Sequence, residues 1–302
     1  MEKPVVTVVG SANMDLVIET PRIPLPGETI IGGDLKRFPG GKGANQAVAA
    51  SRLGAQVYFI GKVGGDDFGV ELKRNLEREG VNTEFLAVDT NYPTGVAFIE
   101  VAEKGENSII VSPGANRNLS KEDICKASKA ISDSHVTLVQ LEIPLPTIEK
   151  VLDLSNKSRV ILNPAPATNL PEEFFRWVYV LTPNTAEAKL LSGIEVEDID
   201  SCRKAAKYFF KMGVKNVVIT LGCRGAFYAT ESKYEVVAPL NIKAVDTTAC
   251  GDAFNGALAV ALAIGKEMKD AVRFATVAGA LTATRWGAQP SLPFIEEVER
   301  FL

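Results

Sequence analysis

The feature of the sequence that most constrains the fold is a regular alternation of helical and strand-like segments from Ser120 onward. Apolar runs of strand length, such as Val136–Leu141 and Val160–Leu162, are separated by segments with the apolar spacing of amphipathic helices. Repeated strand–helix–strand units form a mostly parallel sheet with helices on both faces. The sequence therefore predicts a three-layer α/β/α fold with a mostly parallel central sheet, in which the first of these helices runs from Ser120 to Ile131.

The part of the chain before Ser120 also contains strands that do not alternate with helices. These strand-like runs are Met14–Ile18, Thr29–Leu35, Gly95–Val101 and Ser108–Val111. They form two excursions, at about 14–36 and 93–112, that fit a small separate β-sheet. Because no linker or shift in composition divides the chain, we expect a single domain, 1–302, into which this small sheet is inserted as a lid.

The stretch Ala244–Leu258 is the strongest candidate for a reactive site. It has the pattern of a strand end, a tight turn of small residues and the start of a helix, with Asp252 in the first helical turn. The free N–H groups at a helix start and the helix dipole together bind anions. A carboxylate beside such a site indicates transfer chemistry on a phosphate or carbonyl group, although Asp is also common at helix starts for structural reasons alone.

Small or polar residues follow most of the other predicted strands. They are Asn13 and Asp15, Glu142, Asn163, the segment Thr182–Glu187 and the turn Thr220–Gly225. The carboxyl ends of parallel strands share one edge of the sheet, where ligands bind. Each group alone also fits a turn or surface residue, and Asn184 with Glu187 has the spacing of a helix capping box. All of these groups, and the start of the helix that carries Asp252, are nevertheless predicted to lie at the same edge of the sheet. This agreement favours a ligand crevice there.

The glycine-rich segment Gly40–Asn45 precedes another predicted helix. It is not a phosphate-binding P-loop, because Gly43 stands where that motif has Ser or Thr after its lysine. The segment suits a close-packed turn and suits equally a loop that wraps a small polar ligand, with Asn45 as hydrogen-bond donor and acceptor.

Composition and charge exclude several classes of function. The net charge of −4 argues against nucleic-acid binding through a general basic surface. The single histidine, His135, has no nucleophile motif beside it, which argues against a Ser-His-Asp hydrolase. The four cysteines show no metal-binding spacing and fit a reducing compartment. With no leader-like pattern and no apolar run of the ~20 residues that a membrane helix needs, we expect a cytoplasmic protein without a membrane segment.

Segments spread over nearly the whole chain resemble the ribokinase (PfkB-type) family of carbohydrate kinases. They are GSANMD (Gly10–Asp15), PGGKGANQAVAA (Pro39–Ala50), QLEIP (Gln140–Pro144), NPAPA (Asn163–Ala167), TPNTAEA (Thr182–Ala188), TLGCRG (Thr220–Gly225), AVDTTACGDAFNGAL (Ala244–Leu258) and TRWGAQPS (Thr284–Ser291). The two glycine-rich motifs among them are specific to the family. The family's usual Gly-Ala-Gly-Asp turn is Ala249-Cys250-Gly251-Asp252 here. Since that turn acts through its backbone N–H groups, we expect Ala and Cys to serve in it.

The resemblance implies a role for each matching residue. It makes Asp252 the catalytic base for the sugar hydroxyl, and it makes Ala249, Cys250 and Gly251 the anion hole for the γ-phosphate. It implies that the sugar is bound by Asn13, Asp15, Gly41, Lys42, Asn45, Glu142 and Asp252, and that ATP is bound by Asn184, Thr220, Gly222, Gly225, Gly251 and Thr276. It also implies a K⁺ site at Asp246, Thr248, Thr282, Arg285, Gly287 and Ser291, and a Mg²⁺ ion that Glu187 reaches through water.

The activity that the resemblance implies is phosphorylation of D-ribose at its 5-hydroxyl group by ATP, giving ribose 5-phosphate and ADP in ribose catabolism. Mg²⁺ would be the cofactor and K⁺ an activator. The alternative is a kinase of another substrate on the same fold, such as deoxyribose, fructose or a nucleoside, and a more distant alternative is a sugar-binding regulator without activity. Because the inserted strands match a β lid that often forms dimers in this family, we expect a homodimer.

Overall fold

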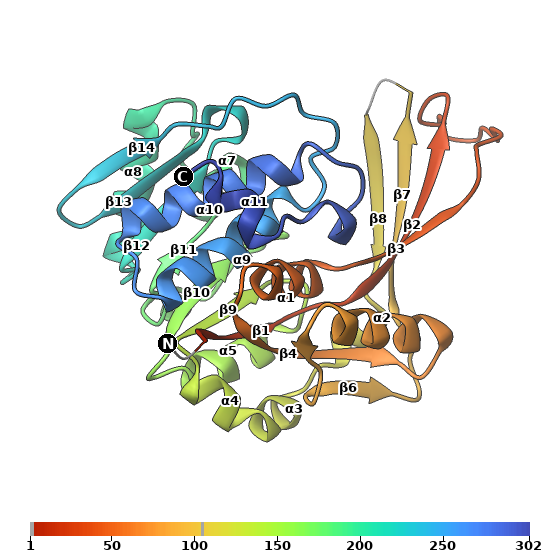
Figure 1. Ribbon diagram of the computed structural model, residues 1–302, viewed down its shortest axis with the longest axis horizontal. Helices are drawn as coiled ribbons and strands as arrows, with labels where there is room; N and C mark the ends of the chain where they lie inside the picture. The colour runs from red at the N-terminus through yellow and green to blue at the C-terminus, as the bar shows by residue number, and fades with distance from the viewer. Residues whose placement is uncertain (1–2, 104–105) are drawn as a thin grey trace.

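The computed structural model of the protein describes residues 3–103 and 106–302, and within them the chain forms two sheets (Figure 1). The larger sheet has ten strands in the order β14-β13-β12-β11-β10-β9-β1-β4-β5, with β6 paired to β4. All neighbours are parallel except β12, β13 and β14, which form an antiparallel edge. The strands are β1 Val5–Val9, β4 Gln56–Gly64, β5 Val81–Asn82, β6 Leu86–Asp89, β9 Val136–Gln140, β10 Arg159–Asn163, β11 Val180–Leu181, β12 Asn216–Thr220, β13 Ala226–Thr230 and β14 Tyr234–Val237.

Helices cover both faces of this sheet, and each face has its own apolar core. One face carries α1 (Lys42–Arg52), α2 (Asp67–Arg78), α9 (Cys250–Ala263), α10 (Met268–Thr282) and α11 (Ile295–Glu299). The other carries α3 (Lys121–Lys126), α4 (Ser128–Asp133), α5 (Leu145–Leu154), α6 (Glu172–Phe175), α7 (Thr185–Ser192) and α8 (Ile199–Lys211). In β1, Val8 packs into the first core and Val9 into the second. The predicted three-layer fold with a mostly parallel sheet is confirmed.

The smaller sheet stands beside the main body and has the order β3-β2-β7-β8 (Figure 1). Its strands are β2 Asn13–Thr20, β3 Lys36–Gly40, β7 Gly95–Ala102 and β8 Asn107–Ser112. The predicted separate sheet is therefore present, but the predicted strand Thr29–Leu35 is wrong, because residues 28–35 are not paired as a strand. The third strand is β3, which ends in Pro39 and Gly40. These residues are tolerated because β3 lies at the edge of the sheet, where Pro39 has no N–H group to contribute.

Two further predictions of secondary structure are wrong in detail. The single helix expected from Ser120 to Ile131 is two short helices, α3 and α4, that meet at Ala127. The apolar spacing also predicts a helix over Met268–Trp286, but α10 ends at Thr282. None of the helices in the described part of the chain is long and apolar enough to cross a membrane.

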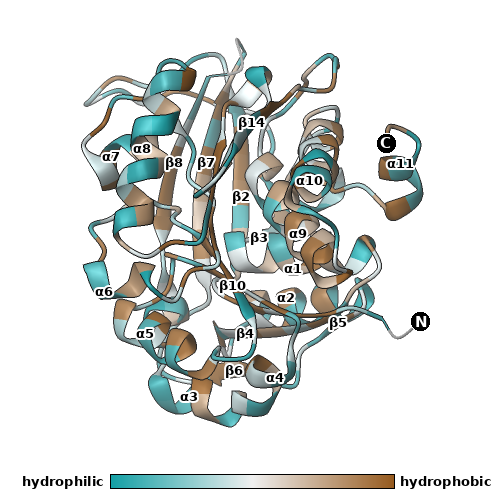
Figure 2. Cartoon of the chain, turned by 90° about the vertical axis from the view of Figure 1, so that its left-hand side faces the viewer, coloured by the Kyte–Doolittle hydropathy of each residue, from teal (hydrophilic) through white to brown (hydrophobic). Residues whose placement is uncertain are grey.

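The helices α1 and α9 lie side by side near the centre of the molecule, and glycine sets how closely they approach. A Cβ atom on Gly256 would lie 2.7 Å from Cβ of Ala49 and 2.8 Å from the main-chain oxygen of Gln46. A Cβ atom on Gly43 would lie 2.7 Å from main-chain atoms of Gly10. Figure 2 shows that α9 is mostly apolar, as expected for a helix with eleven buried residues packed between α1 and α10. This packing holds the first turns of α1 and α9 against the end of β1.

Candidate active site

The polar groups that follow the predicted strands converge at the carboxyl edge of the large sheet. Asn163, at the end of β10, donates from Nδ2 to the main-chain oxygen of Thr182 at 3.3 Å. Asn184, beyond β11, forms an isolated bridge with Thr220 at the end of β12. His135 lies at the opposite edge, where its Nδ1 accepts a hydrogen bond from the main chain of β1. The crevice that the sequence predicts is therefore formed by these strand ends and by the first turns of α1 and α9.

Asp252 lies in the first turn of α9, and only 7% of its surface is exposed. Its two carboxylate oxygens have different partners: Asn45 donates from Nδ2 to Oδ2 at 2.9 Å, and Gln46 donates from Nε2 to Oδ1 at 3.1 Å. Burial raises the pKa of this carboxyl, whereas the Lys42 ammonium and the two amide donors lower it. A buried carboxylate in a fixed orientation at a helix start has the geometry of a general base for a bound hydroxyl group.

Other predicted sugar-binding residues lie beside the start of α1. Asn13 begins β2, and its Oδ1 accepts a hydrogen bond of 2.8 Å from Nδ2 of Asn116, which leaves its own amide nitrogen without a protein partner in the described residues. Gly41 has a φ of 88°, and a Cβ atom there would lie 2.6 Å from the main-chain nitrogen of Asn13. Only glycine fits this position, which brings the first turn of α1 against the start of β2.

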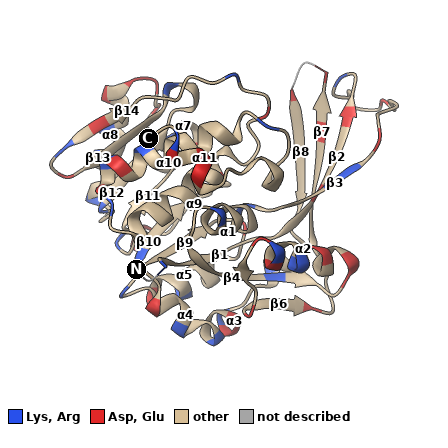
Figure 3. Cartoon of the chain, viewed as in Figure 1, with Lys and Arg blue, Asp and Glu red and all other residues tan. Residues whose placement is uncertain are grey.

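Four carboxyl groups surround the single ammonium group of Lys42. Burial alone would lower the pKa of Lys42, but Asp252, Glu142, Glu187 and Asp15 together raise it. Burial, together with the negative charges of Glu142 and Asp252, raises the pKa of Asp15 to about 7. Elsewhere on the molecule, both signs of charge are dispersed in the view of Figure 3. The excess of carboxylates in the crevice favours ligands that bring hydroxyl donors or cations.

The variant Asp15→Asn is expected to stabilise the ligand-free protein above neutral pH. Because the pKa of Asp15 rises from 3.8 to about 7 on folding, its contribution to stability is complete below the unfolded pKa and is lost as pH rises through the folded pKa. Asparagine has the same shape and carries no charge. We expect the difference in free energy of unfolding between the variant and the wild type to grow by about 2 kcal/mol from pH 5 to pH 8. Urea unfolding at the two pH values measures it. The same difference at both pH values would contradict this assignment.

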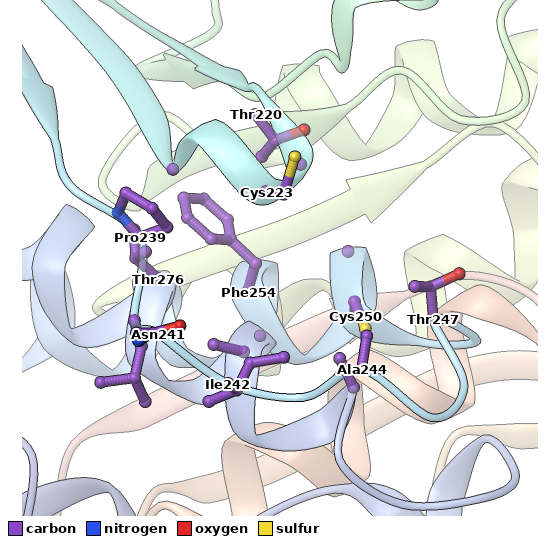
Figure 4. Close-up of a pocket in the computed structure, with 17 residues that line it drawn as sticks. Thr220, Cys223, Pro239, Asn241, Ile242, Ala244, Thr247, Cys250, Phe254 and Thr276 are labelled. Carbon is purple, nitrogen blue, oxygen red and sulfur yellow. The ribbon is translucent and has the colours of Figure 1, made fainter.

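A cavity of ≈ 610 Å³ opens beside the first turn of α9 and is mostly apolar (Figure 4). Five of the six residues predicted to bind ATP line it: Thr220, Gly222, Gly225, Gly251 and Thr276. Figure 4 shows Phe254 of α9 between the turn that carries Thr220 and Cys223 and the loop that carries Asn241 and Ile242. The size and apolar walls suit a flat aromatic group such as a nucleobase.

The sixth predicted ATP residue, Asn184, does not line this cavity but caps α7. Its side chain accepts a hydrogen bond of 2.8 Å from the main-chain nitrogen of Glu187, whose carboxylate accepts one of 2.8 Å from the main-chain nitrogen of Asn184. The capping box that the spacing allowed is thus present. Burial raises the pKa of Glu187, and the nearby charge of Asp252 adds to that rise. A role for Glu187 at a hydrated cation is compatible with this cap, because a carboxylate has further lone pairs.

The turn that is predicted to bind an anion has an unusual backbone conformation at Ala249. This residue precedes α9 in the left-handed region, with φ 59° and ψ 7°, and is the non-glycine residue with positive φ in the described part of the chain. Cys250 and Gly251 follow as the first residues of α9, with their N–H groups at the helix start. Burial raises the pKa of the Cys250 thiol to about 12, so it remains a neutral thiol at neutral pH.

The variant Ala249→Gly is expected to raise the free energy of unfolding by about 1 kcal/mol, because glycine adopts this left-handed conformation without steric cost. The kcat of the phosphoryl transfer that the family resemblance implies should stay within about twofold, since the backbone N–H groups are unchanged. Thermal and urea unfolding measure the first effect and steady-state kinetics the second. A variant less stable than the wild type would show that the alanine methyl group contributes more than the strain costs.

The residues predicted to form a K⁺ site lie in the loop that precedes α9 and in the segment from Thr282, the last residue of α10, to Ser291. The carboxylate of Asp246 accepts hydrogen bonds from the main chain and hydroxyl of Thr248, at 2.9 and 2.7 Å, and from the nitrogen of Gly287 at 2.9 Å. The other three side chains have partners of their own: Arg285 pairs with Glu297, and Thr282 and Ser291 donate to main-chain oxygens of Ala278 and Ala288. The loops thus offer one carboxylate and several main-chain oxygens, the kind of oxygen ligands that an alkali cation accepts.

The profile of the pfkB family of carbohydrate kinases matches residues 3–295. The chain belongs to this family. It is 42% identical to a ribokinase of Haemophilus influenzae over 98% of this chain and 97% of the relative. A crystal structure of a ribokinase from Thermotoga maritima superposes with a TM-score of 0.91 at 42% identity and covers 99% of both chains. An Arabidopsis thaliana ribokinase complexed with ribose and ATP gives a TM-score of 0.91 at 33% identity, over 99% of this chain and 98% of that one.

Several residues of this carbohydrate kinase site had no role assigned from the sequence. Gln46 contacts Asp252, and Asn116 holds Asn13. The loop from Pro239 to Ile242 supplies part of the apolar wall of the large cavity. Gln46 follows directly after Asn45 in the glycine-rich motif, which is the one signal that could have identified it. Nothing in the sequence near Asn116 or Pro239 indicates which distant residues they meet.

Proposed function

We propose that this protein is a ribokinase that transfers the γ-phosphoryl group of ATP to the 5-hydroxyl group of D-ribose. The observation that carries the proposal is the position of Asp252, which is buried, held by two amides and next to Gly251 in the wall of the ≈ 610 Å³ cavity. It also lies close to the polar side chains of Asp15, Lys42, Asn45 and Glu142, which we call the polar pocket. The likeness to ribokinases over the whole chain supports ribose as the sugar.

In this proposal the polar pocket binds the sugar and orients one hydroxyl group toward Asp252. Asn13, Asp15, Lys42 and Glu142 would pair with the remaining hydroxyl groups. Asp252 then accepts the proton of the attacking hydroxyl group, which an ordinarily weak base can do if the proton leaves late in the transfer. The N–H groups at the start of α9 and the Lys42 ammonium stabilise the negative charge on the transferred phosphoryl oxygens.

Two cations complete the proposed site. The acidic surroundings of Lys42 and the raised pKa of Glu187 fit a hydrated Mg²⁺ ion that Glu187 reaches through water. Mg²⁺ supplies neutralisation of the phosphate charge when it is bound with ATP. The loops around Asp246 and Gly287 would hold K⁺ just behind the anion-binding turn, where Asp246 already orients Thr248.

We further propose that the small sheet is a lid and a dimer interface. A second cavity, of ≈ 450 Å³, lies between this sheet and the main body, and Asp15 is part of its wall. Closure of the sheet over this space would exclude water from the reaction. Phe98, Ile109, Ile110 and Val111 of β7 and β8 are 43–68% exposed, which fits a sheet that is covered by a second copy. Light scattering in solution tests the dimer.

The four free cysteines fit the reducing conditions of the cytoplasm, and we propose that location for the enzyme.

The decisive experiment is a screen of ADP release with ribose, deoxyribose, fructose and nucleosides, each with and without K⁺ at constant ionic strength. Ribose should give the highest kcat/KM, and K⁺ should raise it. The position of the phosphate on the product is read by NMR. A higher kcat/KM for another substrate would replace ribose in the proposal but keep the kinase. Sugar binding without any ADP release would indicate a regulator instead.

A further inference from the structure

Gln46 of α1 is completely buried between Asp252 and the end of β10. Its Nε2 group has two hydrogen atoms, and both are used: one toward Oδ1 of Asp252 at 3.1 Å and one toward Oδ1 of Asn163 at 3.0 Å. The reverse orientation of the amide would place its oxygen against these two oxygen atoms. The contacts therefore determine the orientation of the amide.

The hydrogen bonds continue from Asn163 back to α9. Asn163 donates to the main-chain oxygen of Thr182 at 3.3 Å, and the hydroxyl of Thr182 donates to Oδ1 of Asn255 at 2.6 Å. Asn255 in turn donates from Nδ2 to the main-chain oxygen of Gly251 at 2.8 Å. The series begins at the carboxylate of Asp252 and ends at the residue before it, within the anion-binding turn. We call its four buried side chains the amide circuit: Gln46, Asn163, Thr182 and Asn255.

We propose that Gln46 is the positioning residue of Asp252 and that the amide circuit fixes this carboxylate relative to the anion-binding turn. The inference rests on the proposed role of Asp252 as the base. Proton transfer in line with phosphoryl transfer requires that the carboxylate and the anion-binding N–H groups keep one relative geometry. Gln46 holds Oδ1 and so restricts rotation of the carboxylate, while Oδ2 faces Asn45 in the polar pocket.

Gln46 also favours the ionised form of Asp252, because it donates a hydrogen bond to the carboxylate. The charged and titratable groups that act on Asp252 are Lys42, Glu142, Asp15, Glu187 and Cys250. Of these, Lys42 favours ionisation and the acidic groups oppose it. Loss of Gln46 therefore leaves a base that is both less fixed in orientation and harder to ionise.

The first test is the variant Gln46→Met, which keeps length and volume but has no donor. We expect kcat to fall about 10- to 100-fold at pH 7, with the KM of sugar and of ATP within about threefold. The acid limb of the pH profile of kcat should move to higher pH by about 0.5 unit or more, so that part of the loss is recovered at pH 9. The control is Gln56→Met at the exposed start of β4, which should leave kcat and its profile unchanged.

The second test breaks the amide circuit at another point with Thr182→Val, which has nearly the same shape but no hydroxyl group. We expect kcat of Thr182→Val to fall about threefold to tenfold. In the double variant with Gln46→Met, the fold-loss in kcat should be smaller than the product of the two single fold-losses, because both changes interrupt one series of contacts. Multiplicative losses, or a Gln46→Met loss that is the same at every pH, would overturn the proposal.

The variant Asp252→Asn, measured alongside, separates this inference from the proposed function. If Asp252→Asn is inactive while Gln46→Met has wild-type kcat, only the positioning role is wrong. If Asp252→Asn retains turnover, the base assignment itself is wrong. Should Gln46→Met not fold, as judged by circular dichroism, the pH profile of Thr182→Val still decides whether the amide circuit acts on the base.

Discussion

The variant Asp252→Asn is expected to lose at least about 10³-fold in kcat for ribose phosphorylation, while ribose still binds within about threefold of its wild-type affinity. The amide cannot accept the hydroxyl proton, and general-base catalysis contributes about 10²- to 10⁴-fold. The fold should tolerate the change, because the buried Oδ1 of Asn45 has no hydrogen-bond partner among the described residues. A rotated Asn45 amide could therefore accept a hydrogen bond from the new amide group, while Gln46 keeps the orientation that Asn163 requires.

Steady-state ADP release and calorimetric titration with ribose measure the two quantities separately. The matched control is Asp200→Asn on the exposed side of α8, where the carboxylate pairs only with the neighbouring Arg203 among the described residues. That variant should keep wild-type kcat and affinity. An Asp252→Asn enzyme with more than about a tenth of wild-type kcat would show that the hydroxyl proton leaves by another route, and the mechanism would have to be rewritten around a different base.

Much of the candidate site could be predicted from the sequence because ligands bind at the carboxyl ends of parallel strands. Strand ends are visible as the ends of apolar runs, and parallel strands bring their ends to one edge whatever their order. The sequence therefore predicts that Asn163, Thr182 and Asp252 lie at one crevice. In the structure, hydrogen bonds connect Asn163 with Thr182, and Thr182 with the helix α9 that carries Asp252. The individual ligand roles of these residues remain predictions.

The contacts of Gln46 show what could not be predicted. Gln46 reaches Asp252 because α1 crosses α9 at Gly256, where any side chain would collide with Ala49. A helix crossing is a property of two segments far apart in the chain, and the spacing within either helix does not reveal it. The strand β3 is hard to predict for a different reason. Pro39 and Gly40 oppose a strand by local preference, and only the edge position of β3 permits it.

The left-handed conformation of Ala249 also could not be predicted from the preference of its residue type. The sequence shows a small residue in a turn, and the family's usual residue there is glycine, but alanine seldom adopts a left-handed conformation. The structure has Ala249 in that conformation directly before α9, so that the N–H groups of Cys250 and Gly251 lie at the helix start. One of these N–H groups belongs to Gly251, the glycine that remains in the turn.

The variant Gly251→Ala is expected to lower kcat by about 10²-fold or more without destabilising the fold. Gly251 is in α9 and a Cβ atom on it would meet no protein atom within 4 Å. Packing therefore does not require glycine, and alanine in a helix should raise the free energy of unfolding by up to about 1 kcal/mol. Gly251 lines the ≈ 610 Å³ cavity, so the new methyl group would project into it. It would then block the path by which the γ-phosphate is proposed to reach the start of α9.

Thermal unfolding without ligands and initial rates over a range of ATP concentrations test both halves of this expectation. Gly65→Ala is the control, because a Cβ atom there also has room, with its nearest neighbours at 3.8 Å, and the residue is far from α9 in the chain. If Gly251→Ala is as stable as the wild type and as active, the phosphate does not approach this turn. The anion hole would then have to be sought elsewhere along the crevice, with Lys42 as the first candidate. If stability falls instead, the glycine is structural, and its presence in the turn says nothing about phosphate binding.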